Sequence, residues 1–579
     1  MKIQGKVSGT ILWGSMVAFL LFAVYLLYAN QEVLYTAHER SEFLYGAPFF
    51  QTLMQKPFGL VQYVGAWLTQ FFYCPMLGAG MLAALWTLTG YVGAKAFGLK
   101  GGARALMLLP VACLLTSVLD LGYWVYVFHI PGYWFSQSLG YLAMLLLLWG
   151  ARRTPRRWHL VWYLAAFCLY PVLGWFALLL VLCLMLAERP SWRELLALVV
   201  LLSSAAIWRT LLYADCHPDA VMMAGFPRFL TPLDSSERVS IPFWVLGGVT
   251  ALLPLCGRYL KHGLVPVACV AVGIVFTLSL MFRDRNYLTE MRMVRCASDE
   301  DWSQVVQMAE GASEPTTAMV MLKNVALMNE GDLLDRSFKT DNCFHPVCNP
   351  DSIHVGFLSV VAPLVYYHYG MMNEAIRLSF ENAVQTGFSP FYLKVLSRCS
   401  MATGEEALMQ RYAAQLRHHP FYARWQPAPA SPLVKELQHC YADEITGVEN
   451  SDSYLTSTMS YWFGTASALG SEQALFYSMM RRDPACFWPS LRKYVMLHQD
   501  EEFPLFAQEA YILFFDKAPE EKRMMLPVSE EVYDRYKQFW NELKSLSDKK
   551  FSADDMDQEI RKKWSGTYWY YYYFGRRIS

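Results

Sequence analysis

Apolar residues are concentrated in the first 282 positions, in blocks longer than the helices of most soluble proteins. A single crossing of a bilayer needs about 20 such residues. Blocks of suitable length cover 11–28, 73–94, 105–121, 133–149, 195–213, 243–258 and 264–282. From about Arg283 onward, amphipathic helices of ordinary length alternate with Gly, Pro and Ser, and strand patterns are nearly absent. The pattern predicts an all-α protein: a multispanning transmembrane helix bundle over 1–282, then a soluble helical-repeat domain over 283–579.

A further apolar run, from Trp158 to Glu188, is too long for one ordinary crossing and short for two. As one helix it reaches about 45 Å, against about 30 Å of hydrocarbon. A turn at Tyr170, Pro171 and Gly174 gives a hairpin that gathers most span-flanking Lys and Arg on one side, as is typical of cytoplasmic loops. If the run is one unbroken helix instead, some of these Lys and Arg move to the other side, and the charge asymmetry between the two faces is weaker. We therefore predict a hairpin, about nine crossings and a cytoplasmic N-terminus.

Charge differs between the two predicted domains. Through Phe282 there are 18 Lys and Arg against 10 Asp and Glu, and afterwards 31 against 39. The acidic balance of the second domain argues against nucleic acid, which requires a concentrated basic face. With nine crossings this domain lies in the periplasm, and the protein is a multi-pass protein of the bacterial inner membrane in contact with lipid.

Glycines in the second domain recur at a spacing that is typical of helical repeats. Gly370 and Gly404 are 34 residues apart, Gly470 follows 66 residues later, and Gly331 ends an earlier helix pair. A period of 34 is that of tetratricopeptide repeats, which stack helix pairs into a surface for a protein or peptide partner. The alternative is an irregular helical domain that only caps the membrane part.

Two further features of the second domain carry predictions. In "DNCFHPVCNP", Cys343 and Cys348 bracket His345, which in an oxidising compartment suggests a disulfide. Two unpaired thiols are the alternative, and a metal site lacks a fourth ligand, so we expect no metal and no cofactor. The aromatic run Tyr568 to Phe574 is expected to pack against the repeats or, alternatively, to be a docking strand for a partner.

Searches for the common catalytic motifs find none, but polar residues gather on the predicted outer face. If Glu32, Tyr35, Glu39 and Glu42 lie on one face of a helix, they suit cation or sugar-phosphate handling, with a carboxylate as base; a solvated loop is the alternative. Ionisable groups at membrane depth are expected to be paired or to line a cavity. The candidate catalytic residues are Glu32, Glu39, Glu42 and Asp120, and the candidate substrate-binding residues are Arg209, Asp215 and His217.

The stretches "SEFLYGAPFFQTLMQKPFGLVQYVGAWLTQFFYCPMLGAG" and "LYPVLGWFAL", with the aromatic C-terminus, resemble an uncharacterised family of polytopic membrane proteins of gut anaerobic bacteria, across the whole chain. The architecture is also similar, more loosely, to that of multispanning glycosyltransferases that use lipid-linked sugars. That similarity implies Glu32, Glu39 or Glu42 as base or metal ligand and Arg209 on phosphate.

We therefore expect an integral inner-membrane protein that presents a periplasmic helical-repeat domain for protein interaction or envelope assembly. The alternative is a membrane glycosyltransferase with a polyprenyl-phosphate-linked sugar donor. A transporter is disfavoured, because the sequence shows neither paired broken helices nor midplane charges.

Overall fold

The structure is a computed structural model that describes residues 2–126, 130–187, 199, 202–227, 236–259, 264–342, 361–440, 467–499, 501–515, 525–549 and 551–575. Within these ranges every regular element is a helix and no strand occurs, which confirms the all-α class. Cys343 and Cys348 lie outside the described residues, so the proposed disulfide stays a prediction.

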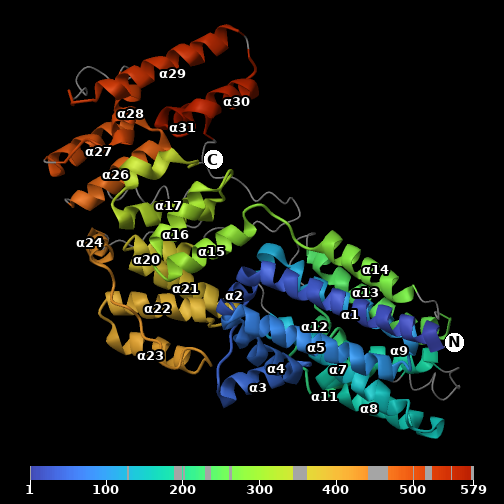
Figure 1. The fold of residues 1–579 in the computed structure, drawn as a ribbon. Helices are drawn as coiled ribbons and strands as arrows, with labels where there is room; N and C mark the ends of the chain where they lie inside the picture. Colours follow the sequence, from blue (N-terminus) through green and yellow to red (C-terminus); the bar gives the residue numbers. More distant parts are fainter. Residues whose placement is uncertain are drawn as a thin grey trace.

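The first half is a bundle of elongated helices (Figure 1). Four segments are long and apolar enough to cross a membrane: Thr10–Ala29, Pro75–Ala96, Gly101–Leu119 and Tyr133–Ala151. The other apolar helices of this half have 10–17 residues in their apolar parts, so the prediction of nine crossings stays a prediction. The long helices are α1 (Lys2–Ala29), α5 (Pro75–Ala96), α6 (Leu108–Leu119, after the 3₁₀ turn η2, Gly101–Met107), α7 (Tyr133–Ala151), α13 (Ser236–Tyr259) and α14 (Val265–Leu280).

The run from Trp158 to Glu188 is broken, as predicted. It forms α8 (His159–Leu173) and α9 (Trp175–Ala187), separated by Gly174 at φ +56°. A Cβ at Gly174 would lie 1.9 Å from the carbonyl oxygen of Ala224, so only glycine fits this turn. The break is therefore confirmed, whereas two crossings of a bilayer stay a prediction. Of the block 195–213, the described part contains α11 (Ser204–Leu211), which is followed by α12 (Pro218–Met222).

The segment predicted as the first external loop is folded. It forms α2 (Gln31–Glu39), α3 (Ala47–Met54), α4 (Gly59–Thr69) and the 3₁₀ turn η1 (Gln70–Tyr73). Here α3 and α4 make a short hairpin, and α4 packs along α7. The loop is therefore part of the bundle rather than a solvated connection.

In the second half, helices pack mainly on their neighbours in sequence. Gly331, Gly370 and Gly404 adopt φ of +79°, +77° and +78° between consecutive helices, as their spacing suggested. Gly470 lies inside a helix instead, so the glycine period does not continue, and a tetratricopeptide-like fold is not established. The helices are α15 (Tyr287–Ser298), α16 (Trp302–Glu310), α17 (Thr317–Glu330), α18 (Leu333–Arg336), α20 (Ala362–His368), α21 (Met372–Thr386), α22 (Pro390–Ala402), α23 (Glu406–Arg417), α24 (Pro432–Cys440), α26 (Ala468–Arg481), α27 (Pro484–Leu497), α28 (Leu505–Phe515), α29 (Glu530–Asp548), α30 (Ala553–Trp564) and α31 (Tyr568–Phe574).

The aromatic run at the C-terminus forms the helix α31, which packs on α28 and α30. Tyr568 and Trp569 are fully buried, and the Tyr568 hydroxyl donates to the Met479 carbonyl oxygen at 2.9 Å. Intramolecular packing is therefore confirmed. The alternative of a docking strand is wrong, because these rings fill the core of their own chain in a helix.

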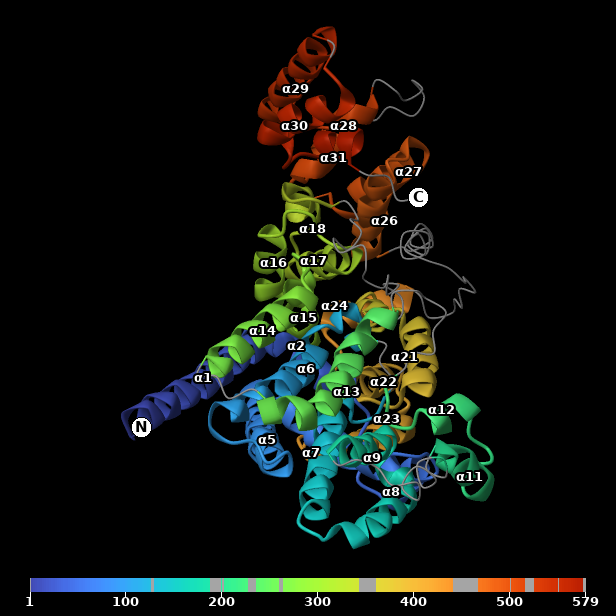
Figure 2. The ribbon, with the colours of Figure 1, turned by 90° about the vertical axis from the view of Figure 1, so that its right-hand side faces the viewer.

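The two halves share one continuous cluster of buried apolar side chains. The start of α1 lies at the end of the bundle opposite the second half, and α28–α31 lie farthest from the bundle (Figures 1 and 2). The chain passes from α14 to α15 within a few residues of Phe282, where the predicted domain boundary falls, and Phe282 and Leu288 on either side pack against this common core.

Candidate functional site

The short helix α2 carries three consecutive ionisable residues into the contact between the halves. His38, Glu39 and Arg40 are 0%, 7% and 7% exposed, respectively. The helix begins directly after α1. Glu32 lies in its first turn, where the positive end of the helix dipole stabilises a carboxylate. It packs against η1 and α5 of the bundle and against α15 and α22 of the second half. We call the residues around α2 the junction.

Glu39 forms a buried ion pair across the junction. Its Oε1 lies 2.8 Å from Nζ of Lys394 on α22, and the Tyr422 hydroxyl donates a hydrogen bond to the same oxygen. Burial raises the pKa of Glu39, but the charges of Lys394 and His38 outweigh it and lower the pKa to about 2. This carboxylate is therefore ionised and paired with a cation, and its low pKa makes it a poor general base.

Two histidines lie beside this pair. The Tyr422 hydroxyl donates to Glu39, and its oxygen lies 3.2 Å from Nε2 of His38. Burial lowers the pKa of His38 to about 4 and that of His419 to about 2. Nδ1 of His38 and both ring nitrogens of His419 are buried without a hydrogen-bond partner among the described residues. Both rings are therefore neutral near neutral pH.

Arg40 points to the other side of α2, into aromatic rings of the second half. Its guanidinium lies 3.7 Å from the ring centre of Phe391 and donates to the Tyr392 hydroxyl at 3.1 Å. The ring of Tyr126 lies 5.3 Å from the same group. A planar cation suits such a site, because it stacks on rings while it donates hydrogen bonds.

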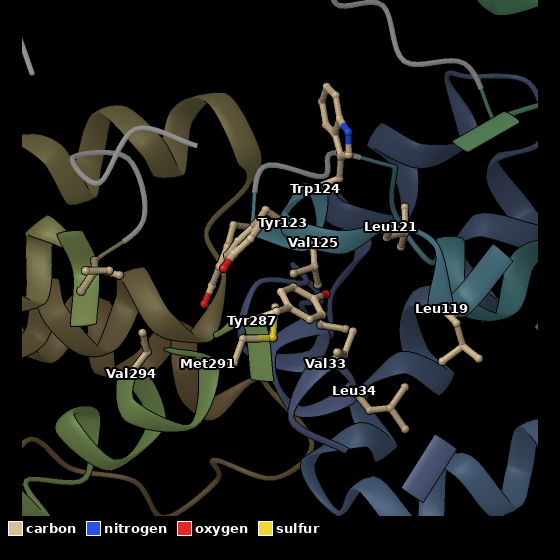
Figure 3. Close-up of a cluster of buried hydrophobic side chains, with 14 of the residues drawn as sticks. Val33, Leu34, Leu119, Leu121, Tyr123, Trp124, Val125, Tyr287, Met291 and Val294 are labelled. Atoms are coloured by element: carbon tan, nitrogen blue, oxygen red, sulfur yellow. The ribbon is translucent and has the colours of Figure 1, made fainter. Parts of the chain in front are cut away.

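Apolar side chains complete the junction (Figure 3). They come from α2, from the 3₁₀ turn η3 (Gly122–Tyr126) and from α15. The Tyr287 hydroxyl donates to the Gly122 carbonyl oxygen at 2.9 Å, and the Tyr123 and Tyr287 rings are 5.1 Å apart. The junction is thus a packed interior and not a surface contact.

The other two predicted glutamates also contact the second half. Glu32 lies 3.6 Å from Arg295 of α15, whose guanidinium covers the Tyr35 ring at 4.1 Å. Glu42 follows the end of α2 and packs against Gly387, where burial raises its pKa. The shared helical face is confirmed for Glu32, Tyr35 and Glu39, which α2 contains, whereas Glu42 lies beyond the helix.

The remaining predicted site residues do not join this cluster. Asp120 is buried at the end of α6. Arg209, Asp215 and His217 are exposed on or between α11 and α12, which pack against α8 and each other. Arg209 therefore does not share a site with Glu39, because α11 packs beside α8 whereas α2 packs against the second half.

The cavity beside Glu39 and Arg40 has a volume of about 20 Å³. That is room for about one water molecule. Neither Asp120 nor Arg209 lines it. Among the described residues no group of three His, Cys, Asp or Glu could hold a metal ion.

Sequence reasoning missed the partners of α2: Lys394, Tyr422, His419 and Tyr392. They are more than 350 positions away from α2, so no local spacing connects them with it. One hint was available, since Lys394 interrupts the apolar stretch "PFYLKVL" of α22, where a charge requires a partner.

A family model described as "Family of unknown function (DUF6057)" matches residues 6–575. The chain belongs to this family. The match covers both halves and every residue of the junction, so the two halves are found together in the family. Comparisons with curated proteins and with solved structures found no match.

Proposed function

We propose that the protein is a multi-pass inner-membrane protein that holds its second half rigidly on the periplasmic face, as a surface for assembly with an envelope protein. The buried ion pair between Glu39 and Lys394 is the observation that carries this proposal. A domain on a flexible tether needs no buried contact with the bundle, whereas a domain that is held in a fixed orientation does.

Exposed apolar side chains support the membrane placement. Trp13, Leu21 and Tyr25 of α1 are 68%, 64% and 66% exposed and follow one another along one face of the helix. A continuous apolar face of this kind is unfavourable in water and is typical of contact with lipid. The start of α1, with Lys2 and Lys6, lies opposite the second half, so a cytoplasmic N-terminus places that half outside.

A groove between α28 and α29 is the surface that we propose for the partner. Its volume is about 1000 Å³, and Tyr511, Phe515, Tyr533 and Trp540 contribute rings to it. Glu530 and Asp534 add two negative charges against one positive charge from Lys537. The groove suits an apolar segment of a protein that carries a basic residue. A tetratricopeptide-like stacking of α15–α23 would hold this groove away from the bilayer.

No described contact favours the glycosyltransferase alternative. Of its three candidate bases, Glu39 is paired with Lys394 and Glu32 lies 3.6 Å from Arg295, and the cavity beside Glu39 has room for about one water rather than for a lipid-linked sugar.

Topology reporters test the membrane placement. Alkaline phosphatase, which is active only outside the cytoplasm, and a fluorescent protein that folds in the cytoplasm are fused separately after Arg157 and after the C-terminus. We expect fluorescence after Arg157 and phosphatase activity after the C-terminus. Fluorescence of the C-terminal fusion would overturn the periplasmic placement.

A photo-crosslinking residue at position 533 tests the partner surface in intact cells. We expect one discrete product with another envelope protein, and its loss in Trp540→Ser. A matched probe at position 549, exposed at the far end of α29, is the control. Equal products at both positions would contradict a specific groove.

A further inference from the structure

The hairpin of α3 and α4 enters the bundle from the end that bears the second half. Near that end, Gly65 of α4 packs so closely on α7 that an added Cβ would lie 2.5 Å from the Gly132 carbonyl oxygen. At the tip, the ring of Phe58 lies against Gly140, eight residues farther along α7. At 1.5 Å per residue, α4 therefore follows α7 for about 12 Å and stops well inside its length.

The helix α8 approaches the same point from the opposite end. The Trp162 ring lies against Gly150, close to the last residue of α7, and after the break at Gly174 the Phe176 ring lies against Gly140. The two tips are joined by a hydrogen bond, in which Phe58 N–H donates to the Pro171 carbonyl oxygen at 2.7 Å. Two helices that each cover part of α7 thus meet beside its middle.

The meeting point is irregular and polar, although apolar helices surround it. Phe58, Gly174 and Gly225 have φ of +69°, +56° and +76° there. The side-chain amide of Gln137 donates to the Gly225 carbonyl oxygen at 2.8 Å. Gln137 is 3% exposed, and its Oε1 has no hydrogen-bond partner among the described residues. Nε1 of Trp175, beside the same segment, is also buried and has no partner within the described part of the chain.

Non-helical backbone is restricted at membrane depth. The helix α7 is one of the four segments able to cross a bilayer. Irregular backbone halfway along such a segment is tolerated where it is buried in protein or lines a polar cavity, and transporters bind substrate between opposed broken helices at this depth. The sequence analysis did not pair the α3–α4 hairpin with the break at Gly174.

We propose that α3–α4 and α8–α9 are re-entrant hairpins from opposite membrane faces, and that their meeting point binds a small anionic solute on its way between the faces. The proposal rests on the membrane placement proposed above. The solute must also carry a hydrogen-bond donor, because Gln137 Oε1 can only accept, whereas Trp175 Nε1–H donates to the anionic group. The helices α4 and α9 both begin here, so the positive ends of two helix dipoles favour a negative charge.

Cysteine reactivity in membrane vesicles of both orientations tests the site, with single cysteines in a chain whose 13 native cysteines are alanine. The probes are the anionic sulfonatoethyl and the cationic trimethylammonioethyl methanethiosulfonates. We expect Gln137→Cys to react at least about tenfold faster than Met144→Cys, a fully buried control on α7, because water reaches only the former. The anionic reagent is expected to react faster than the cationic one.

The outcomes separate the two proposals. Rapid reaction of Leu21→Cys, on the exposed apolar face of α1, overturns the membrane placement itself. If Leu21→Cys is protected while Gln137→Cys reacts no faster than Met144→Cys, only the solute site is overturned. A preference of Gln137→Cys for the cationic reagent overturns the anionic class.

The native chain in lipid nanodiscs gives a second measurement that needs no substitution. Backbone hydrogen exchange at residues 56–60 and 171–177 is expected to be faster than at 143–148 of α7, since water enters only at the meeting point. Equal protection of the three segments contradicts the proposal.

Discussion

Two buried glutamates, one at the junction and one at the far end of the second half, have pKa values shifted in opposite directions. Glu39 at the junction contacts Nζ of Lys394 at 2.8 Å, and its pKa falls to about 2. Glu509 lies beneath α31, where Oε2 accepts from Tyr568 N–H at 2.7 Å and the nearest Arg535 nitrogen is 3.9 Å from Oε1. Burial raises its pKa to about 8.

The difference shows that a contacting cation sets the direction in which the pKa of a buried carboxylate shifts. Removal from water destabilises the ionised form of both carboxylates, and only at the junction does a contacting cation outweigh this cost. Glu39 therefore ties two halves of the chain by charge. Glu509 is held mainly as a neutral acid that supports the aromatic packing of α31.

The largest expected effect comes from Lys394→Met, which leaves the Glu39 carboxylate buried without its cation. We expect a loss of about 3–5 kcal/mol in the free energy of unfolding, measured by urea denaturation in detergent. Lys562→Met, at an exposed ion pair with Glu559, is the matched control and should cost less than about 1 kcal/mol. The double variant Glu39→Gln with Lys394→Met should recover part of the loss. Equal losses in Lys394→Met and Lys562→Met would contradict a buried tie.

A second expected effect is an opposite response of the two ends to pH. His38 has a folded pKa near 4, below its ordinary 6.5, so the unfolded chain binds the proton first and the junction loses stability as pH falls below 6.5. Glu509 has a folded pKa near 8, above its ordinary 4.5, so the region of α28–α31 loses stability as pH rises from 4.5 to 8. Each slope is at most about 1.4 kcal/mol per pH unit. Glu39 adds none in this range, because its contribution is lost only below pH 4.5, as pH falls toward 2.

Region-resolved hydrogen exchange at pH 5, 6.5 and 8, corrected for intrinsic rates, measures both responses. His38→Gln should reduce the acid sensitivity of α2 and α22 alone, and the part that remains is that of His419, whose pKa is lowered to about 2. Glu509→Gln should abolish the alkaline sensitivity of α28 and α31 alone. If both ends of the native chain lose stability in the same pH direction, the predicted contrast between the junction and α28–α31 is wrong.

The smallest expected effect is that of Arg40→Lys. The ammonium keeps the charge but loses stacking on Phe391 and the planar geometry of the bond to Tyr392, so we expect a loss of about 1–2 kcal/mol. Arg104→Lys, at an exposed position of the bundle, should change stability by less than about 0.5 kcal/mol. Thermal unfolding of the two variants side by side decides whether the stacked guanidinium matters.

Local patterns predicted the elements well where one physical cause dominates. The apolar blocks are helical where they are described, and three of four repeat glycines took left-handed turns. The predicted break occurs at Gly174, whereas Tyr170 and Pro171 lie inside α8. Gly470 failed because its spacing alone says nothing about backbone conformation, which α26 fixes as helical.

The sequence by itself determined the all-helical class, the apolar first half and the acidic second half, because periodicity and composition are local properties of the chain. Only the tertiary structure decided that α2 pairs with α22, that α31 is an interior helix, and that α4 meets α8 beside α7. Each of those contacts joins side chains or backbone far apart in the chain, and the energy that fixes them, the pairing of a buried charge or of a buried polar group, exists only after these distant segments have packed together.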